Sequence, residues 1–178
     1  MIGSANKRKG GRAALILIAL GIAVFLYILP AMPAEKLPVP RGAVNDYAHV
    51  IPPEIKSKME NLSREVHEKT GTAIVVAVVP TVGENDVREY TNELYRKWGI
   101  GEKGKDKGVL IFLAMKERRV RIEIGYGVEG ILPDGLVGEI LDENFMPAAR
   151  SGDYAVGLYN TQVAVAAVQR FGGDVGGR

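Results

Sequence analysis

The sequence predicts a three-layer α/β/α sandwich with a mixed central sheet, preceded by one N-terminal transmembrane helix. Three observations favour this fold class. The first is an apolar run at residues 13–29, and the second is a strand-like, helix-like and strand-like succession between residues 72 and 114. The third is an alternating segment at 119–124, which follows a short connection. Strand, helix and strand in this order form a right-handed parallel crossover, and the short connection adds an antiparallel hairpin.

The N-terminal segment is predicted to anchor the chain in a membrane. Residues 1–12 contain four basic side chains and no acidic one, and the apolar run extends over 13–32 if Pro30 is tolerated near its end. About 20 apolar residues span a bilayer, and positive flanks stay in the cytoplasm. We therefore expect a single-pass protein of the inner or plasma membrane, with a basic cytoplasmic flank and an extracytoplasmic (periplasmic) C-terminal domain.

A cleaved signal peptide is the alternative interpretation of the same segment. It has a basic n-region, an apolar h-region and a small residue, Ala34, at the possible cleavage point. Met32, two positions before Ala34, fits an A-x-A cleavage site poorly, and the apolar run is long for an h-region. These features favour an uncleaved anchor.

Charge and cysteine content exclude several function classes. The formal net charge is +2, but residues 1–12 contribute four positive charges, so residues 13–178 hold 19 basic residues against 21 acidic ones. No basic face is left to suggest a nucleic-acid partner. The chain has no cysteine, which excludes disulfides, thiolate metal sites and cysteine nucleophiles.

The exported part is predicted to be one domain at residues 43–171, between a linker and a tail. The linker, 33–42, contains three prolines in its PAEKLPVP stretch and shows no helical or strand period. The tail, 172–178, is rich in glycine and is expected to be disordered. A domain of roughly 130 residues is large enough to be stabilised by its core without disulfides.

The first half of this domain is predicted to contain two helices around a buried strand. The first helix covers about 53–69, with one apolar face made of Ile55, Met59, Leu62 and Val66. The continuous β-branched run at 72–79 predicts a strand covered on both faces. The second helix begins near Asp86, with Glu89 placed as in a capping box. Its buried stripe is expected to be Val87, Tyr90, Leu94 and Trp98.

The second half is predicted to contain a hairpin followed by two helices. The apolar segment 109–114 reads as a strand buried on both faces, and 115–118 connects it to the alternating strand 119–124, whose Val120, Ile122 and Ile124 face a core. A third helix, about 135–145, is expected to bury Leu136, Val137, Ile140 and Leu141. A fourth, about 154–171, is so apolar that we expect it to pack closely on the sheet through residues that include Val163, Val165, Val168 and Phe171.

Several segments of the chain together resemble the TPM domain family over roughly residues 43–171. They are NDYAHVI, GTAIVVAVVP, YRKWGIG, DKGVLIFLA, RRVRIEIGYGVEGILPD and SGDYAVGL, in this order. Their order and spacing make the resemblance specific. The family includes a thylakoid-lumen protein of photosystem II repair and many bacterial envelope proteins, so the resemblance implies a role outside the cytoplasm.

No familiar catalytic motif is present. The sequence contains no HExxH, GxSxG or GxxxxGK[ST] pattern. Residues 125–130, GYGVEG, have the form GxGxxG but do not open directly into a helix, which excludes a dinucleotide site. We expect these glycines to permit positive φ at a turn where the backbone passes close to another segment. The two histidines, His49 and His67, are interpreted as an ordinary loop residue and a solvated helix residue.

Carboxylates are the remaining candidates for chemistry. The hairpin places Asp106, Glu129 and Asp134 at one end of the sheet, and oxygen ligands on loops suit Ca²⁺ or Mg²⁺. The family resemblance further implies that the acidic positions Asp46, Asp106 and Asp134 belong to a metal site. The alternative is that Asp134 caps a helix and Asp106 is a solvated turn residue. Lys107 stands where relatives often carry an acidic or amide residue, which weakens a cation site.

Two functions remain in competition. The first is a membrane-tethered accessory module that binds a partner protein, in assembly, repair or quality control of membrane protein complexes. The second, implied by the resemblance, is a metal-dependent acid phosphatase of the cell envelope, in which Lys103, Lys105 and Lys107 would bind the phosphate. The lack of a nucleophile–base pair favours the accessory module, and no catalytic residue is assigned.

Overall fold

The computed structural model describes residues 37–101 and 104–172. The predicted flank at 1–12, the predicted transmembrane segment at 13–32, the start of the linker and the tail beyond Gly172 lie outside the described residues. Among the residues that are described, no helix is both long enough and apolar enough to cross a membrane.

Four strands form one mixed sheet in the order β1-β2-β3-β4. Strands β1 (Val44–Asp46), β2 (Ala73–Val79) and β3 (Gly108–Ala114) are parallel, and β4 (Arg119–Ile124) is antiparallel to β3. The predicted parallel crossover and the predicted hairpin are both confirmed. In the hairpin Val109 pairs with Ile124 and Ala114 pairs with Arg119.

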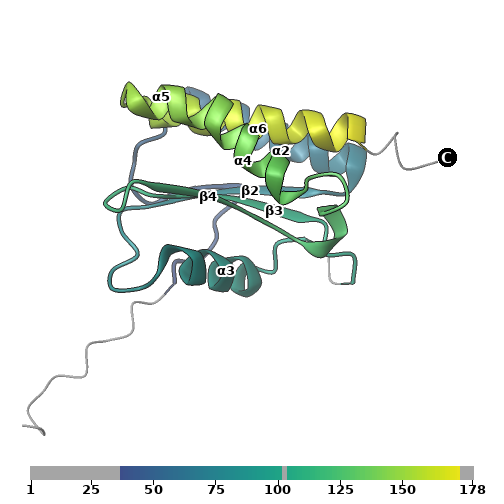
Figure 1. Ribbon diagram of the computed structural model, residues 1–178, viewed down its shortest axis with the longest axis horizontal. Helices are drawn as coiled ribbons and strands as arrows, with labels where there is room; N and C mark the ends of the chain where they lie inside the picture. The colour runs from purple at the N-terminus through teal and green to yellow at the C-terminus, as the bar shows by residue number, and fades with distance from the viewer. Residues whose placement is uncertain (1–36, 102–103, 173–178) are drawn as a thin grey trace, which may run out of the picture. The chain divides into compact units, whose positions relative to one another are not determined.

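Helices cover both faces of the sheet (Figure 1). One face carries α2 (Pro53–Thr70), α4 (Asp134–Ile140), α5 (Met146–Arg150) and α6 (Tyr154–Phe171), and the other carries α3 (Val87–Trp98). The sequence explains where two of these helices end and begin. Gly71 ends α2, with a φ of 73° in the left-handed region. Asp86 begins α3, because its side chain accepts hydrogen bonds from the Arg88 and Glu89 backbone N–H groups.

Successive side chains of each strand point to opposite faces of the sheet, so the core is divided between these two faces. On the α2 and α6 side, Val76 and Ile111 are fully buried among aliphatic side chains of those helices. On the α3 side, Leu110 and Phe112 pack against Tyr90 and Leu94. The Tyr90 and Phe112 rings lie 5.6 Å apart at a tilt of 41°. Because β3 is buried on both faces, it is the centre of the domain.

The predicted third helix, 135–145, is divided in the structure. It consists of α4, a π-helical turn η2 (Leu141–Phe145) and the short α5. Within η2 the N–H of Met146 donates to the carbonyl of Leu141, five residues earlier. Pro147 explains the change of register, because it has no N–H for the carbonyl of Glu143 and cannot continue a regular ladder. Of the four side chains expected to be buried here, only Ile140 is fully buried.

Helix α6 packs on the sheet as predicted, but through a narrower stripe than its composition suggests. Leu158 and Val165 are completely buried, whereas Val163 is 42% and Phe171 74% exposed. The expectation that the last two would pack on the sheet is wrong, because α6 lies in an outer layer and its far side faces solvent. Buried polar side chains take part in the stripe instead: Gln162 donates from Nε2 to the Met59 carbonyl at 2.9 Å.

The last residues of the predicted linker lie against the domain. Leu37 is only 9% exposed and belongs to the core cluster on the α3 side. The indole Nε1 of Trp98 donates to the Pro38 carbonyl at 2.8 Å, and the Tyr47 hydroxyl donates to the Val39 carbonyl. Prolines give this segment its extended backbone, but two side-chain donors and one apolar side chain fix it in place.

Leu37→Ala should lower the free energy of unfolding by about 2 kcal/mol, because it removes apolar area that the domain buries. Val39→Ala is the matched control: Val39 is 75% exposed, so its truncation should change stability by less than about 0.5 kcal/mol. Urea unfolding followed by the fluorescence of Trp98, the single tryptophan of the chain, measures both. Equal effects of the two substitutions would contradict the docking of this segment.

Candidate functional site

The glycine-rich turn after β4 packs its backbone directly on the loop before β3. A Cβ atom on Gly125 would lie 2.1 Å from the Asp106 carbonyl oxygen, and one on Gly127 would lie 2.1 Å from the Lys105 carbonyl oxygen. The N–H of Gly127 donates to the Asp106 carbonyl at 3.1 Å. Only glycine permits this approach, which confirms that the backbone here passes close to another segment.

The second part of that prediction, positive φ within the turn, is wrong. Gly125 has a φ of −81°, and Asp106 on the facing loop is the residue in the left-handed region, with a φ of 48°. Aspartate tolerates this conformation better than most residues because its short side chain bonds locally. The glycines are thus required for proximity, and the aspartate takes the unusual backbone conformation.

The Asp106 carboxylate joins three elements. Its Oδ1 accepts a hydrogen bond from the Tyr95 hydroxyl of α3 at 3.2 Å, and its Oδ2 accepts one from the Tyr126 backbone N–H at 3.0 Å. Tyr126 begins the 3₁₀ turn η1 (Tyr126–Val128). Burial, with the nearby Asp106 charge adding to it, raises the pKa of Tyr95 well above its usual 10.0. The hydroxyl therefore remains a donor at physiological pH.

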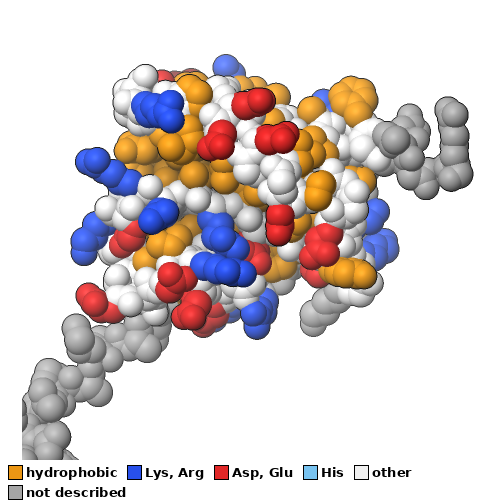
Figure 2. All heavy atoms as spheres, in the orientation of Figure 1, with side chains coloured by type: hydrophobic (Ala, Val, Ile, Leu, Met, Phe, Trp, Pro, Cys, Tyr) orange, Lys and Arg blue, Asp and Glu red, His pale blue; other side chains and the backbone are white. Residues whose placement is uncertain are grey.

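An open groove of about 620 Å³ lies beside this junction, between the C-terminal part of α3 and the end of β4. We call it the acidic groove, because among the described residues three carboxylates line it (Asp106, Glu123 and Glu129) against one guanidinium, that of Arg96. Figure 2 shows basic and acidic side chains intermixed over one face of the molecule. The surplus of negative charge in the acidic groove is therefore a local feature, and it does not reflect the net charge of the chain.

Tyr126 projects from the rim of the acidic groove. Its side chain is 81% exposed although its backbone N–H is fixed by Asp106. Such an exposed aromatic side chain on a fixed turn is unusual, since tyrosine ordinarily covers part of its ring. The groove itself mixes polar groups with the apolar side chains of Ile100 and Ile124.

The structure separates Asp46 from the other predicted ligands. Asp46 is paired with Val78 near the carboxyl ends of the parallel strands, whereas Asp106 precedes Gly108, which is paired with Ala73 at their amino ends. Five residue steps along the strand separate these two levels, a distance of roughly 16 Å. The segment after β1 therefore does not bring Asp46 to the acidic groove.

Asp46 has a clear local role instead. Its Oδ1 accepts from the Ala48 N–H at 3.1 Å and its Oδ2 from the Ile51 N–H at 2.8 Å. This pattern is typical of an aspartate that satisfies the backbone of a turn. It fixes the connection between β1 and α2.

The four predicted ligands do not form one cation site in the described part of the chain. Asp106 and Glu129 share the acidic groove, but Asp134 is exposed in the first turn of α4 and does not line it. Among the described residues, no three or more His, Cys, Asp or Glu side chains are placed to hold one metal ion. Both oxygens of Asp106 also already accept hydrogen bonds. The arrangement does not fit Ca²⁺ or Mg²⁺ held by these four residues.

Sequence reasoning missed the two tyrosines of this site. Tyr95 lies next to the predicted stripe of α3, and its partner is eleven residues away in a different element, so helical periodicity gives no sign of the contact. Tyr126 stands between two glycines, which is the only sequence signal that it is presented on a tight turn. His49 and His67 are both exposed, and neither lines the acidic groove.

Comparisons with known proteins agree with this geometry. A family model described as the TPM domain matches residues 44–172. The solution structure of the N-terminal domain of a protein from P. gingivalis is similar, with a TM-score of 0.67 and 35% identity, covering 71% of this chain and 80% of that one. No curated protein matches.

Two more distant structures show the same fold. The N-terminal domain of a Corynebacterium glutamicum protein has a TM-score of 0.58 at 17% identity, covering 76% of this chain and 85% of that one. The BA42 protein of the psychrophilic bacterium Bizionia argentinensis has a TM-score of 0.59 at 15% identity, covering 69% and 83%. At this identity the likeness concerns the fold alone.

Asp106→Ala should lower the free energy of unfolding by about 1–3 kcal/mol, because two hydrogen bonds are lost and alanine is strained at positive φ. Asp106→Asn is the matched control, since asparagine tolerates this φ and can accept from Tyr126 and donate to Tyr95. It should change stability by less than about 0.5 kcal/mol. Denaturant unfolding with and without millimolar Ca²⁺ measures both effects. A Ca²⁺-dependent stabilisation that Asp106→Asn abolishes would show that a cation, rather than a hydrogen-bonded junction, explains this residue.

Stability should fall more steeply above pH 10 in the parent than in Tyr95→Phe. The unfolded chain releases the Tyr95 proton near pH 10.0, whereas the folded chain retains it. The folded state then binds more protons, so the free energy of unfolding decreases as pH rises through this range, by up to about 1.4 kcal/mol per pH unit. Tyr126→Phe removes an exposed hydroxyl and should keep the parental slope. Parallel slopes for the parent and Tyr95→Phe would contradict a buried Tyr95 hydroxyl.

Proposed function

Because this chain belongs to the TPM domain family, we propose that it acts as a membrane-tethered, extracytoplasmic binding module. In this proposal the domain docks a partner protein and takes part in assembly, repair or quality control of membrane protein complexes. The observation that carries the proposal is Tyr126, which is 81% exposed on a turn that Asp106 and two glycines hold in place.

The fixed turn favours docking for an energetic reason. Exposed tyrosines are among the side chains that contribute most to protein–protein binding when a partner covers them. Ordering a flexible loop would subtract from the binding free energy, whereas this turn is already ordered by the Gly127 N–H and Tyr126 N–H hydrogen bonds to Asp106. The partner therefore meets a preformed aromatic contact.

The acidic groove supports a particular chemistry for the partner. Glu129 and Asp106 line it, while Glu123 is half-buried and pairs with Arg121 at 3.2 Å. A partner segment with basic side chains and an apolar or aromatic residue would complement the carboxylates, the exposed ring and the walls formed by Ile100 and Ile124. We propose such a segment as the occupant of the groove.

The tether follows from the sequence. The apolar run at 13–32, preceded by four basic residues, is proposed as a single uncleaved span of the inner or plasma membrane with the domain on the periplasmic side. This placement restricts the partner to proteins that expose a basic segment outside the cytoplasm.

The acid phosphatase alternative receives less support from the groove. The described residues that line it include no serine, cysteine or histidine, and Asp106, the best-placed carboxylate, already accepts two hydrogen bonds. Of the three lysines proposed to bind phosphate, Lys103 lies outside the described residues, and Lys107 lines a different cavity. A hydrolase would need a nucleophile with a base in contact, which the described groove does not offer.

A photoreactive phenylalanine analogue in place of Tyr126 should give one discrete cross-linked adduct when the full chain is produced in its own cells and illuminated. The same analogue in place of Glu143, an exposed residue of η2, is the control and should give none. Glu129→Lys should reduce the adduct at position 126 several-fold, because it reverses a charge in the acidic groove. Glu139→Lys, an exposed change on α4, should leave it unchanged.

Three outcomes would contradict the proposal. They are the same adduct at positions 126 and 143, no loss of the adduct with Glu129→Lys, and a partner located only in the cytoplasm. Turnover of a phosphomonoester by the purified full chain, abolished by Asp106→Asn, would establish the phosphatase in place of the binding module.

A further inference from the structure

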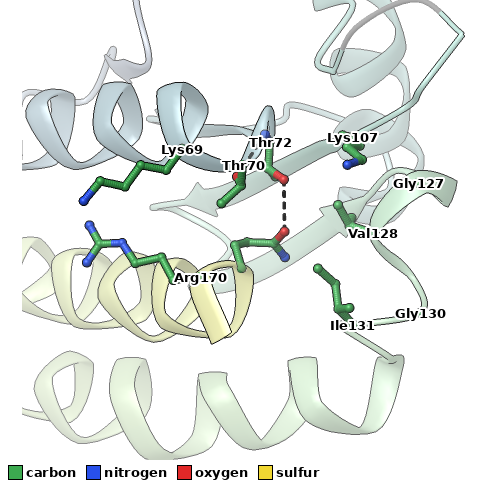
Figure 3. A pocket seen from close by; sticks show the side chains of 10 residues that line it. Lys69, Thr70, Thr72, Lys107, Gly127, Val128, Gly130, Ile131 and Arg170 are labelled. Carbon is green, nitrogen blue, oxygen red and sulfur yellow. Dashed lines mark hydrogen bonds between the residues drawn. The ribbon is translucent and has the colours of Figure 1, made fainter. Parts of the chain in front are cut away.

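A second cavity lies on the other side of the glycine-rich turn (Figure 3). It has a volume of about 460 Å³ and is formed where α2 and α6 end, where β2 and β3 begin, and where the chain leaves η1. We call it the basic cavity, since its lining, taken over the residues that the structure describes, includes the side chains of Lys69, Lys107 and Arg170 and no acidic one.

Two of the three cations have an ordinary structural explanation. Lys69 and Arg170 lie in the last turns of α2 and α6, where positive charge complements the helix dipole. Both pair with one oxygen of Glu65, Lys69 Nζ at 2.7 Å and an Arg170 nitrogen at 2.9 Å. One carboxylate faces two cations, however, so the pair of helix ends retains a positive charge.

Lys107 has no such explanation. It comes directly after Asp106 and is half-buried at the cavity wall. Within the described ranges, no acidic side chain forms an ion pair with Lys107. Lys107 therefore provides a cation to the cavity.

Gln169 supplies the second and independent observation. Its side chain is 97% buried and lines the cavity, and its Oε1 accepts from the Thr72 hydroxyl at 3.0 Å. Its Nε2 has no acceptor within the described structure. Buried amide nitrogens nearly always donate a hydrogen bond, so this donor at the cavity wall is suited to an oxygen atom supplied by a ligand.

Two other buried atoms without partners differ from it. They are Glu117 Oε2 and Gln162 Oε1; both are acceptors, and neither residue lines the basic cavity. Of these three atoms, only Gln169 Nε2 is a donor, and only Gln169 lies at the positively charged cavity.

We propose that the basic cavity binds an oxyanion group, a phosphate or a carboxylate, through Lys107 and the amide of Gln169, whereas Arg170 lies toward Lys69 at the other end of the cavity (Figure 3). Lys107 provides the charge and Gln169 the neutral donor, as in charge-assisted recognition of oxyanions. Val128 and Ile131 form the apolar part of the lining, so a ligand with a short apolar portion next to its anionic group fits best. This site lies outside the acidic groove and does not depend on partner docking there.

Titration of the ¹⁵N-labelled full chain with inorganic phosphate, and separately with acetate, tests the proposal by NMR. A nonionic detergent keeps the predicted apolar segment in solution. The side-chain amide of Gln169 and the backbone amides of Thr72, Lys107 and Val128 should shift with saturation. Lys107→Gln should weaken the binding at least fivefold. Lys58→Gln is the matched control, because Lys58 is an exposed lysine of α2 that does not line the cavity; it should bind as the parent does.

Each outcome decides the matter. Tighter binding of phosphate than of acetate assigns the phosphate, and the reverse assigns the carboxylate; both support the cavity as an oxyanion site. Gln169→Met provides a second variant, which removes the amide donor and should also weaken binding if Lys107→Gln proves unstable. No saturable shift up to 50 mM of either anion, or equal weakening by Lys107→Gln and Lys58→Gln, would overturn the proposal. Loss of the Tyr126 adduct with normal phosphate binding would affect only the docking proposal.

Discussion

The contact of the Gly125 and Gly127 backbone with residues 105 and 106 is the constraint on which this end of the domain depends. A Cβ on either glycine would lie 2.1 Å from a carbonyl oxygen of the facing loop, so no substitution preserves the approach without moving backbone. Asp106 completes the contact by joining the Tyr95 hydroxyl and the Tyr126 N–H. The two glycines, which have no side chain, and the Asp106 carboxylate thereby fix the relative positions of α3, the start of β3 and the end of β4.

The same constraint divides the space around it. Residues of one turn face two different cavities: Tyr126 and Glu129 line the acidic groove, whereas Gly127 and Val128 line the basic cavity. Because the two cavities share this turn, the carboxylates that line one lie close to the cations that line the other. Electrostatic recognition at either cavity can then be specific although the chain as a whole has a formal net charge of only +2.

Much of the fold could be predicted from the sequence, because its information is local. The apolar run at 109–114 and the alternation at 119–124 determine both strands, and a four-residue connection between them leaves one register, in which Leu113 pairs with Val120. The division of the third helix was not predicted, since Pro147 acts through the carbonyl ladder of the turn before it. The exposed Phe171 was missed because composition alone does not tell which side of α6 meets the sheet.

The candidate site could be predicted only in part, because several of its contacts join residues that are far apart in the sequence. A hairpin argument correctly places Asp106 near Glu129, but the contacts of Tyr95 and of Gln169 are tertiary, and the latter reaches Thr72 across 97 residues. Gln162 and Gln169 are two turns apart on the same buried stripe of α6. Gln162 donates to the Met59 carbonyl and to the Ser63 hydroxyl, which joins α6 to α2. At Gln169 the two helices end, no α2 group takes the equivalent place, and the amide that would otherwise join helices faces the basic cavity. Gln169 therefore differs from Gln162 because it lies at the end of the α2–α6 interface, where its amide nitrogen has no partner among the described residues.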